Sequence, residues 1–174
     1  MLAPGMVFDP TDEELVSNFL IEKASGASEG ELSDFIKYIA LYQHAPSQLR
    51  SLAQDSGHEK WYFFTHLEKK YQQGRNINRQ VPGGYWQKTC PPSLIKDKAG
   101  NTIAKKTSLT YYKKDRTSAQ PEKTKWLMKE YMLENQPPNI PNDKESEMLT
   151  LCYIYRSKHH RRTTNRRRNS DVNN

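Results

Sequence analysis

The sequence is poor in cysteine and in apolar residues. Its 174 residues include two cysteines, Cys90 and Cys152, and 34% hydrophobic residues. Two cysteines cannot build the dense disulfide framework of a small secreted scaffold, so a reducing compartment is the simplest setting. No stretch approaches the roughly 20 apolar residues of a membrane-spanning helix. The N-terminal residues lack the basic segment and the apolar segment that make up a secretory signal. We therefore expect neither a secretory signal nor a membrane partner.

The sequence also lacks the motifs of common catalytic and nucleotide-binding sites. It contains no G-x-S-x-G, no glycine-rich phosphate-binding motif and no C-x-x-C pair. Cys152 stands in an apolar run, which predicts a small buried side chain rather than a nucleophile. We therefore expect no enzymatic activity, no metal, no cofactor and no small-molecule substrate.

Aromatic residues, in contrast, are plentiful. The chain has 3 Trp, 10 Tyr and 5 Phe, and disordered chains are poor in these residues. With 174 residues a single domain is the default. We expect one real core of modest size, surrounded by polar loops or tails.

The net charge of +7 is distributed unevenly along the chain. Residues 1–60 have a net charge of −6, whereas residues 61–130 hold 15 basic and 5 acidic residues, a net charge of +10. Residues 156–174 add a net charge of +6. An asymmetry of this size favours a polyanionic partner for the basic parts.

The residue pattern predicts an α+β fold, with an antiparallel sheet and helices packed beside it. Thr11 and Glu14 form a capping-box pattern at the start of an amphipathic helix over residues 10–23. Pro46 begins a second, short helix that runs to residue 54. Aromatic and β-prone segments predict strands at residues 61–65, 84–89, 106–112, 125–133 and 149–156, with shorter strands at 6–8 and 35–39.

Five blocks of the sequence, in order, resemble the plant NAC domain. Residues 3–16 resemble its opening LPPGFRFHPTDEELV, and residues 39–49 its second block. Residues 59–64, 75–79 and 84–89 resemble three parts of its third block, which read EWYFF, RPNR and GYWKATG. Residues 105–111 and 123–133 resemble two parts of its fourth block, KKTLVFY and KTNWIMHEYRL. Residues 151–155 resemble its fifth block, LCRIY. Each block alone is weak, but five in the family's order are highly specific.

The resemblance implies a twisted antiparallel β-sheet flanked by a few helices. It also implies a nuclear transcription regulator that binds duplex DNA and forms homo- or heterodimers with NAC-type proteins. We assign residues 2–158 to this NAC-like domain and expect residues 159–174 to be a disordered basic tail. Residues 156–162, with residues 166–168, also resemble a nuclear-import signal or a non-specific phosphate-binding arm. Family members usually continue into a long activation region, and none is evident here. We therefore expect a truncated or repressive member, or one that depends on a heterodimer partner.

The expected DNA-reading element is the strand that corresponds to GYWKATG. Alternation along a strand places Tyr85, Gln87 and Thr89 on one face and Trp86 and Lys88 on the other. If Trp86 packs in the core, Tyr85 and Gln87 face the groove, where they can touch a thymine methyl and an adenine edge. The full set of expected DNA contacts is Arg75, Arg79, Tyr85, Gln87, Lys88, Thr89, Lys105, Lys106, Lys113, Lys114 and Lys123. The expected dimer contacts are Leu2, Pro4, Gly5, Val7, Phe8 and Glu14.

Several positions depart from the family pattern. In the stretch that corresponds to WKATG, Gln87 stands in place of the family Lys, Lys88 in place of the Ala and Cys90 in place of the Gly. We therefore expect weaker or altered recognition of bases. Val7 replaces the Arg that pairs with the position of Glu14, so we expect a weaker dimer. Two alternatives stay open at this point: a NAC-fold interaction module with weakened DNA binding, and a nuclease or other RNA-processing enzyme.

Overall fold

The computed structural model of the chain describes residues 6–26, 35–68, 77–115, 117–135 and 147–157. The expected tail at 159–174 lies outside these ranges. The helical elements are α1 (Asp12–Glu14), the π-helical η1 (Leu15–Leu20), α2 (Ile21–Ser25), the short η3 (Leu41–Gln43) and α3 (Pro46–Leu52). The strands are β1 (Lys37–Tyr38), β2 (Lys60–Glu68), β3 (Gln80–Val81), β4 (Gly84–Lys88), β5 (Ser93–Lys96), β6 (Thr102–Lys113), β7 (Glu122–Leu133) and β8 (Glu147–Arg156).

The predicted N-terminal helix is present as the continuous run α1–η1–α2. The capping box at its start is confirmed: the Glu14 carboxylate accepts from the Thr11 N–H at 2.8 Å, and the Thr11 hydroxyl accepts from the Glu14 N–H at 3.3 Å. These bonds satisfy two backbone groups that a helix end would otherwise leave unpaired. The run ends at Gly26, whose φ of 69° is a left-handed conformation that glycine adopts without steric cost.

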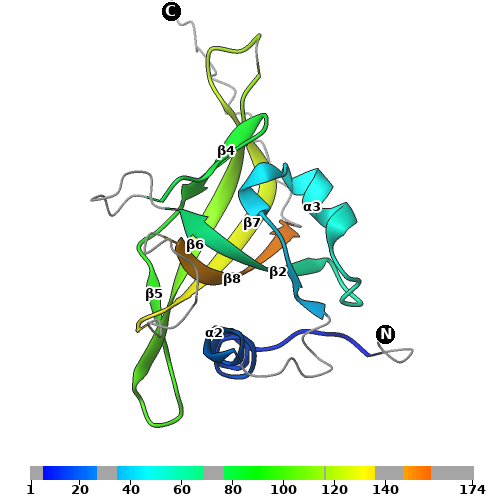
Figure 1. Cartoon of the computed structure of the whole chain (residues 1–174). Helices are drawn as coiled ribbons and strands as arrows, with labels where there is room; N and C mark the ends of the chain where they lie inside the picture. The colour runs from blue at the N-terminus through cyan, green and yellow to red at the C-terminus, as the bar shows by residue number, and fades with distance from the viewer. Residues whose placement is uncertain (1–5, 27–34, 69–76, 116, 136–146, 158–174) are drawn as a thin grey trace, which may run out of the picture.

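The described strands form one curled sheet in the order β1-β2-β8-β7-β6-β4-β3, and β5 also pairs with β6 (Figure 1). All neighbouring pairs are antiparallel except β1 and β2, which are parallel. The predicted α+β class is confirmed, with a mixed rather than purely antiparallel sheet. The five longer predicted strands correspond to β2, β4, β6, β7 and β8.

One predicted strand is wrong. Residues 6–8 form no strand, although the Phe8 N–H donates to the Ser56 carbonyl at 2.9 Å. The Phe8 side chain is buried and contacts the rings of Phe19, Phe35 and Tyr62 at centroid distances of 5.5, 5.3 and 5.0 Å. This segment is therefore held by an aromatic anchor and not by a ladder of backbone bonds.

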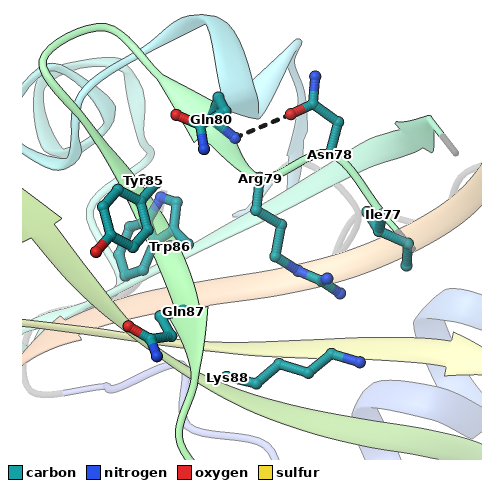
Figure 2. Close-up of a pocket in the computed structure, with 8 residues that line it drawn as sticks. All are labelled: Ile77, Asn78, Arg79, Gln80, Tyr85, Trp86, Gln87 and Lys88. Carbon is teal, nitrogen blue, oxygen red and sulfur yellow. Dashed lines mark hydrogen bonds between the residues drawn. The ribbon is translucent and has the colours of Figure 1, made fainter. Parts of the chain in front are cut away.

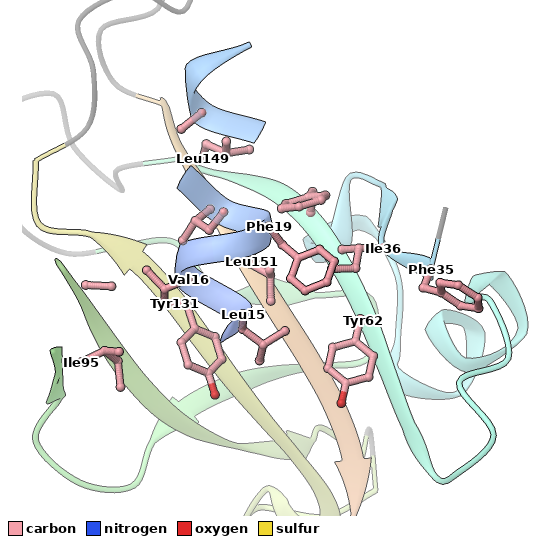
Figure 3. Close-up of a cluster of buried hydrophobic side chains, with 14 of the residues drawn as sticks. Leu15, Val16, Phe19, Phe35, Ile36, Tyr62, Ile95, Tyr131, Leu149 and Leu151 are labelled. Carbon is pink, nitrogen blue, oxygen red and sulfur yellow. The ribbon is translucent and has the colours of Figure 1, made fainter. Parts of the chain in front are cut away.

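The N-terminal helix packs on one face of the sheet, which we call the helix face. Leu15, Val16 and Phe19 point from the helix toward Tyr62, Tyr131 and Leu151 of the sheet (Figure 3). Leu15, Val16, Tyr62, Tyr131 and Leu151 are each at most 1% exposed. The predicted apolar stripe of the helix thus forms one of two cores.

The second core lies on the opposite face, which we call the α3 face. Leu49 of α3 and Leu41 of η3 belong to it, together with Trp86, Met128 and Ile154 of the sheet. Because each strand alternates between the two cores, the sheet is covered on both sides, and the predicted core role of Trp86 is confirmed at 3% exposure.

Asp12 ties the helix to the sheet through polar contacts. Its carboxylate forms an ion pair with Lys106 of β6 and accepts a hydrogen bond from the Tyr131 hydroxyl of β7 at 2.5 Å. Burial by itself opposes the charged carboxylate, but the bonds from Lys106 and Tyr131 outweigh it and lower the pKa of Asp12 below its ordinary 3.8. Asp12 therefore stabilises the fold only while it is ionised.

This lowered pKa predicts a loss of stability in acid. The contribution of Asp12 is fully present above the unfolded pKa of 3.8 and disappears as the pH falls through the lower folded value. An ion pair this exposed is worth about 1 kcal/mol, so we expect Asp12→Asn to lower Tm by about 2–4 °C at neutral pH. In thermal melts, the difference from wild type should shrink as the pH falls below 3.8 and vanish once the pH is below the folded pKa. The control is Glu13→Gln, which makes the same charge change in the same turn; its Tm difference from wild type should not depend on pH in this way. If the Tm difference of Asp12→Asn were independent of pH, the role of the carboxylate would be contradicted.

Candidate nucleic-acid interface

The strand expected to read DNA, β4, lies near one edge of the sheet. Its inner side pairs with β6 from Gly84 to Lys88. On its outer side, β3 covers only Gly84 and Tyr85 in register, and the Trp86 N–H donates to the Arg79 carbonyl at 3.0 Å. Within the described residues, no strand flanks the outer side of β4 at Gln87 and Lys88, which leaves this part of the edge open.

The side chains of β4 divide between the two faces as the sequence predicts. Trp86 packs in the α3-face core against Tyr111, with ring centroids 5.4 Å apart. Gln87 and Tyr85 lie on the other face, because they stand opposite Thr110 and Tyr112 of β6. In Figure 2 the Gln87 amide and the Lys88 ammonium leave the strand in opposite directions, around a hollow of about 330 Å³. Both side chains are exposed.

The ring of Tyr85 is held in place although it is only half-buried. It stacks on the ring of Tyr112, with centroids 5.6 Å apart and an interplanar angle of 8°. The Lys114 ammonium lies 5.6 Å from the Tyr85 centroid and donates to the Gln80 side-chain oxygen at 3.3 Å. A ring fixed in this way loses little conformational entropy when it binds a partner.

Thr89 and Cys90 follow directly after β4 and are both exposed. The Thr89 N–H and hydroxyl both donate to the Ser108 carbonyl, at 3.0 and 3.2 Å. The hydroxyl oxygen of Thr89 keeps its acceptor capacity, because only its proton is used in that bond. These bonds extend the fixed part of the reading strand one residue beyond Lys88.

The prediction that Arg79 contacts DNA phosphates does not fit its environment. The guanidinium forms a two-pronged pair with Glu130 of β7: Nε lies 3.0 Å from Oε1 and Nη2 lies 2.6 Å from Oε2. The two side chains are 9% and 0% exposed. The Tyr42 hydroxyl also donates to Glu130. Arg79 thus anchors the β3–β4 hairpin to the middle of the sheet.

Burial alone would lower the pKa of Arg79, but the hydrogen bonds and charge of Glu130 raise it above its ordinary value. Burial, with the Glu130 charge adding to it, raises the pKa of the Tyr42 hydroxyl well above its ordinary value. Both groups therefore stay protonated and remain donors to Glu130 at any physiological pH.

The expected lysine contacts separate into two groups along β6. Lys106 pairs with Asp12, and Lys105 pairs with Glu134 at 2.8 Å. Lys113 lies eight residues beyond Lys105 along β6, which corresponds to a distance of about 27 Å. Lys105 and Lys106 are thus committed to internal carboxylates at the far end, whereas Lys113, Lys114 and Lys123 gather near the β3–β4 turn. Arg75 lies outside the described residues.

Residues outside the expected set of DNA contacts complete this picture. Lys125, Trp126 and Arg156 stand beside Lys113 and Lys123, and Glu130 and Tyr42 hold Arg79. The burial of Glu130 could have been predicted from the sequence. It lies two residues from Met128 and from Met132 in β7, so its side chain is on the same face of the sheet as the buried Met128. A carboxylate at a buried strand position requires a partner.

The expected dimer residues have different environments. Leu2, Pro4 and Gly5 lie outside the described residues. Val7 is 52% exposed, whereas Phe8 is 7% exposed and belongs to the helix-face core, so its side chain is committed within the chain. Glu14 is exposed and engaged in the capping box, whose bonds from the Thr11 backbone and hydroxyl lower its pKa. The Phe8 side chain is therefore a core anchor.

The described ranges hold no metal site and no activated buried thiol. They contain no cluster of three or more His, Cys, Asp or Glu side chains able to hold a metal ion. Cys152 is fully buried, and burial raises the pKa of its thiol well above the ordinary value. Such a thiol stays protonated and acts as a core residue. Among the helices that the structure describes, none has the length and apolar character needed to cross a membrane.

A curled sheet with a helix on one face, a short helix on the other and a cluster of cations beside β4 defines an α+β domain with a basic surface. The family model "No apical meristem (NAM) protein" matches residues 3–133. The chain therefore belongs to the NAM, or NAC-domain, family.

Curated relatives agree with this membership. The chain is 36% identical over 158 residues to NAC domain-containing protein 7 of Arabidopsis thaliana, covering 89% of this chain and 38% of that protein. It is 36% identical over 160 residues to NAC domain-containing protein 2 of the same plant, covering 90% and 53%. It is 36% identical over 169 residues to NAC transcription factor 56, also from Arabidopsis thaliana, covering 89% and 44%. The chain thus spans roughly half or less of these relatives' lengths.

Proposed function

We propose that this chain is a transcription regulator that acts in the nucleus and binds duplex DNA sequence-specifically, with the outer edge of β4 in the major groove. The observation that carries this proposal is the division of β4: Trp86 closes the core on one face, and Tyr85 and Gln87 stand on the other. Lysines without internal carboxylate partners lie beside this strand. The printed name of the relative NAC transcription factor 56 supports the regulatory role.

The geometry suits the major groove, which is about 12 Å wide and admits β-strands, so the open outer edge of β4 can enter it. The Gln87 amide can donate to and accept from adenine at N7 and N6, and the held ring of Tyr85 can contact a thymine methyl. The Thr89 hydroxyl and Lys88 lie at the far end of the same strand. Lys113, Lys114 and Lys123 would contact phosphates, which fix the register but carry no base information.

The proposal leaves three of the expected contacts out of the DNA interface. Arg79, Lys105 and Lys106 are engaged with Glu130, Glu134 and Asp12. Freeing Arg79 would leave the buried Glu130 carboxylate uncompensated, which is costly. The more exposed pairs of Lys105 and Lys106 offset a phosphate contact by about 1 kcal/mol at most. The DNA-binding set thus narrows to β4 and the cations at the β3–β4 end of the sheet, with Arg75 of the preceding segment.

We further propose that the chain dimerises with itself or with another NAC-type protein through its N-terminal segment. Val7 is exposed there, next to the anchored Phe8. Val7 cannot form an ion pair with Glu14 of a partner, so this dimer is expected to be weak. Because an exposed ion pair contributes at most about 1 kcal/mol, its loss does not by itself abolish the contact.

Selection of bound duplexes from a random pool tests the function. A regulator of this kind should enrich one short motif over a scrambled duplex by at least about a thousandfold in affinity. Tighter binding of a random single-stranded RNA pool than of any duplex would favour an RNA-processing role instead. Absence of any enriched duplex would contradict the proposal and favour a protein-interaction module with this fold.

Gln87 provides the sharpest test of the reading face. We expect Gln87→Ala to reduce discrimination at one base pair by about 1–3 kcal/mol, and Gln87→Lys to shift the preferred base there from adenine to guanine. Electrophoretic binding assays on duplexes differing at each position of the selected motif would measure both effects. Gln54→Ala, at a half-buried glutamine that follows α3 and lines neither hollow beside β4, is the matched control. Unchanged preference in Gln87→Lys would show that β4 does not read bases.

A further inference from the structure

A basic hollow lies at the end of the sheet where β6 turns into β7. Its volume is about 650 Å³, and its lining includes residues of α3, the β3–β4 turn and the adjoining ends of β6, β7 and β8. Five cations surround it: Lys113, Lys114, Lys123, Lys125 and Arg156. The lining contains one carboxylate, Glu122. None of the ion pairs formed among the described residues uses any of these five cations.

One cation of the hollow, Arg156, is held in place by an aromatic ring of the lining. The Arg156 guanidinium carbon lies 5.5 Å from the centroid of the Trp126 ring. The Trp126 ring lies 5.9 Å from that of Trp61, and the Arg50 guanidinium carbon lies 5.3 Å from Trp61 on the far side. A guanidinium stacked on an indole keeps its N–H groups free at the rim, so it is preorganised for an anion.

The hollow is continuous with the proposed reading strand. Pro82 and Gly83 of the β3–β4 turn form part of its wall. Lys114, which also lines it, holds the ring of Tyr85 and the side chain of Gln80. From Gly84 to Lys88, β4 extends about 14 Å, close to the width of the major groove of about 12 Å. A phosphate strand that borders the groove at Gly84 would therefore lie next to the hollow.

We propose that this hollow is a phosphate-binding site for the DNA backbone, in which Lys125 and Arg156 join Lys123 in contacting the strand beside the β3–β4 turn. The site deepens and rests on the proposed DNA-binding function. It extends the DNA contact from the edge of β4 onto the α3 face of the sheet. An acidic peptide could use the same charges, but continuity with the reading strand favours the nucleic acid.

The test removes the two cations that the site adds. Each phosphate contact contributes about 0.9 to the slope of log K against log salt. We expect Lys125→Gln with Arg156→Gln to lower that slope by about 1.8 and to weaken binding about ten- to a hundredfold at 0.1 M salt. The probe is the duplex selected by the wild-type protein, measured against salt by fluorescence anisotropy. Both side chains are exposed, so thermal melts should show a folded variant.

Lys96→Gln with Lys98→Gln is the matched control, because these two exposed cations lie on the β5–β6 hairpin and give the same change in net charge. The control should leave the slope unchanged and affect affinity less than about twofold. Equal slopes in wild type and in the Lys125 and Arg156 variant would overturn the site while leaving the DNA-binding function intact. Failure of the wild-type protein to bind any selected duplex would instead refute the proposed function itself.

Discussion

Replacing Gly84 by alanine is expected to weaken DNA binding at least tenfold and to lower the stability of the sheet by about 1–3 kcal/mol. A Cβ atom at Gly84 would lie 2.2 Å from the Tyr112 carbonyl oxygen and 2.6 Å from the Tyr111 hydroxyl. The Tyr112 carbonyl belongs to β6 and cannot retreat without breaking the pairing of Tyr112 with Tyr85. The substitution should therefore displace the start of β4, which positions Tyr85 and Gln87.

The effect should appear in two measurements on the same protein. Thermal unfolding should show Tm lowered by about 2–10 °C, and anisotropy titration of the selected duplex should show the affinity loss. Gly100→Ala is the control: it lies on the β5–β6 hairpin, where nothing stands within 4 Å of its Cβ, although its φ of +88° carries its own strain. That variant should lose some stability and bind DNA normally. Wild-type DNA affinity in Gly84→Ala would show that the position of β4 does not matter for binding.

The parts of the fold that could be predicted from sequence are those that short-range physics determines. The capping box of Thr11 and Glu14 spans three residues, and both of its hydrogen bonds are present. The alternation that assigns Trp86 to the core and Gln87 to the surface is a property of any strand. By contrast, β5 contributes only one buried residue, Ile95, and carries no clear alternating pattern, so its pairing with β6 was not foreseen.

The site was less predictable, because the fate of each cation depends on distant residues. Lys106 is neutralised by Asp12, which lies 94 positions earlier in the chain, and Arg79 by Glu130, which lies 51 positions later. Local charge counting placed these cations with Lys113 and Lys123, since all occur in the same basic segment. Only the folded sheet distinguishes lysines that already have carboxylate partners from those that are available to a phosphate.

Among the ion pairs of the described residues, the buried pair of Arg79 and Glu130 should be the most sensitive to mutation. Breaking a buried ion pair by removing one partner costs about 3–5 kcal/mol, because the remaining charge stays buried without compensation. We expect Glu130→Gln, which keeps the shape and removes the charge, to lower Tm by about 10 °C. Tyr42→Phe removes only one hydrogen bond to the same carboxylate and should cost about 1.5–3 kcal/mol.

Removing both charges separates the structural role of Arg79 from the phosphate contact that the sequence suggested. In a Tyr42→Phe background, which leaves no buried hydroxyl without its acceptor, Arg79→Met combined with Glu130→Met should recover most of the stability lost in Glu130→Gln, since an apolar pair of similar volume often replaces a buried ion pair at little cost. Because Arg79 anchors β3 from inside the sheet, the double variant should retain the salt dependence of wild-type DNA binding. A stable double variant whose salt slope falls by about 0.9 would show that Arg79 leaves Glu130 to bind a phosphate in the complex. The two measurements, melting temperature and salt slope, thus decide between an internal anchor and a DNA contact for the same guanidinium.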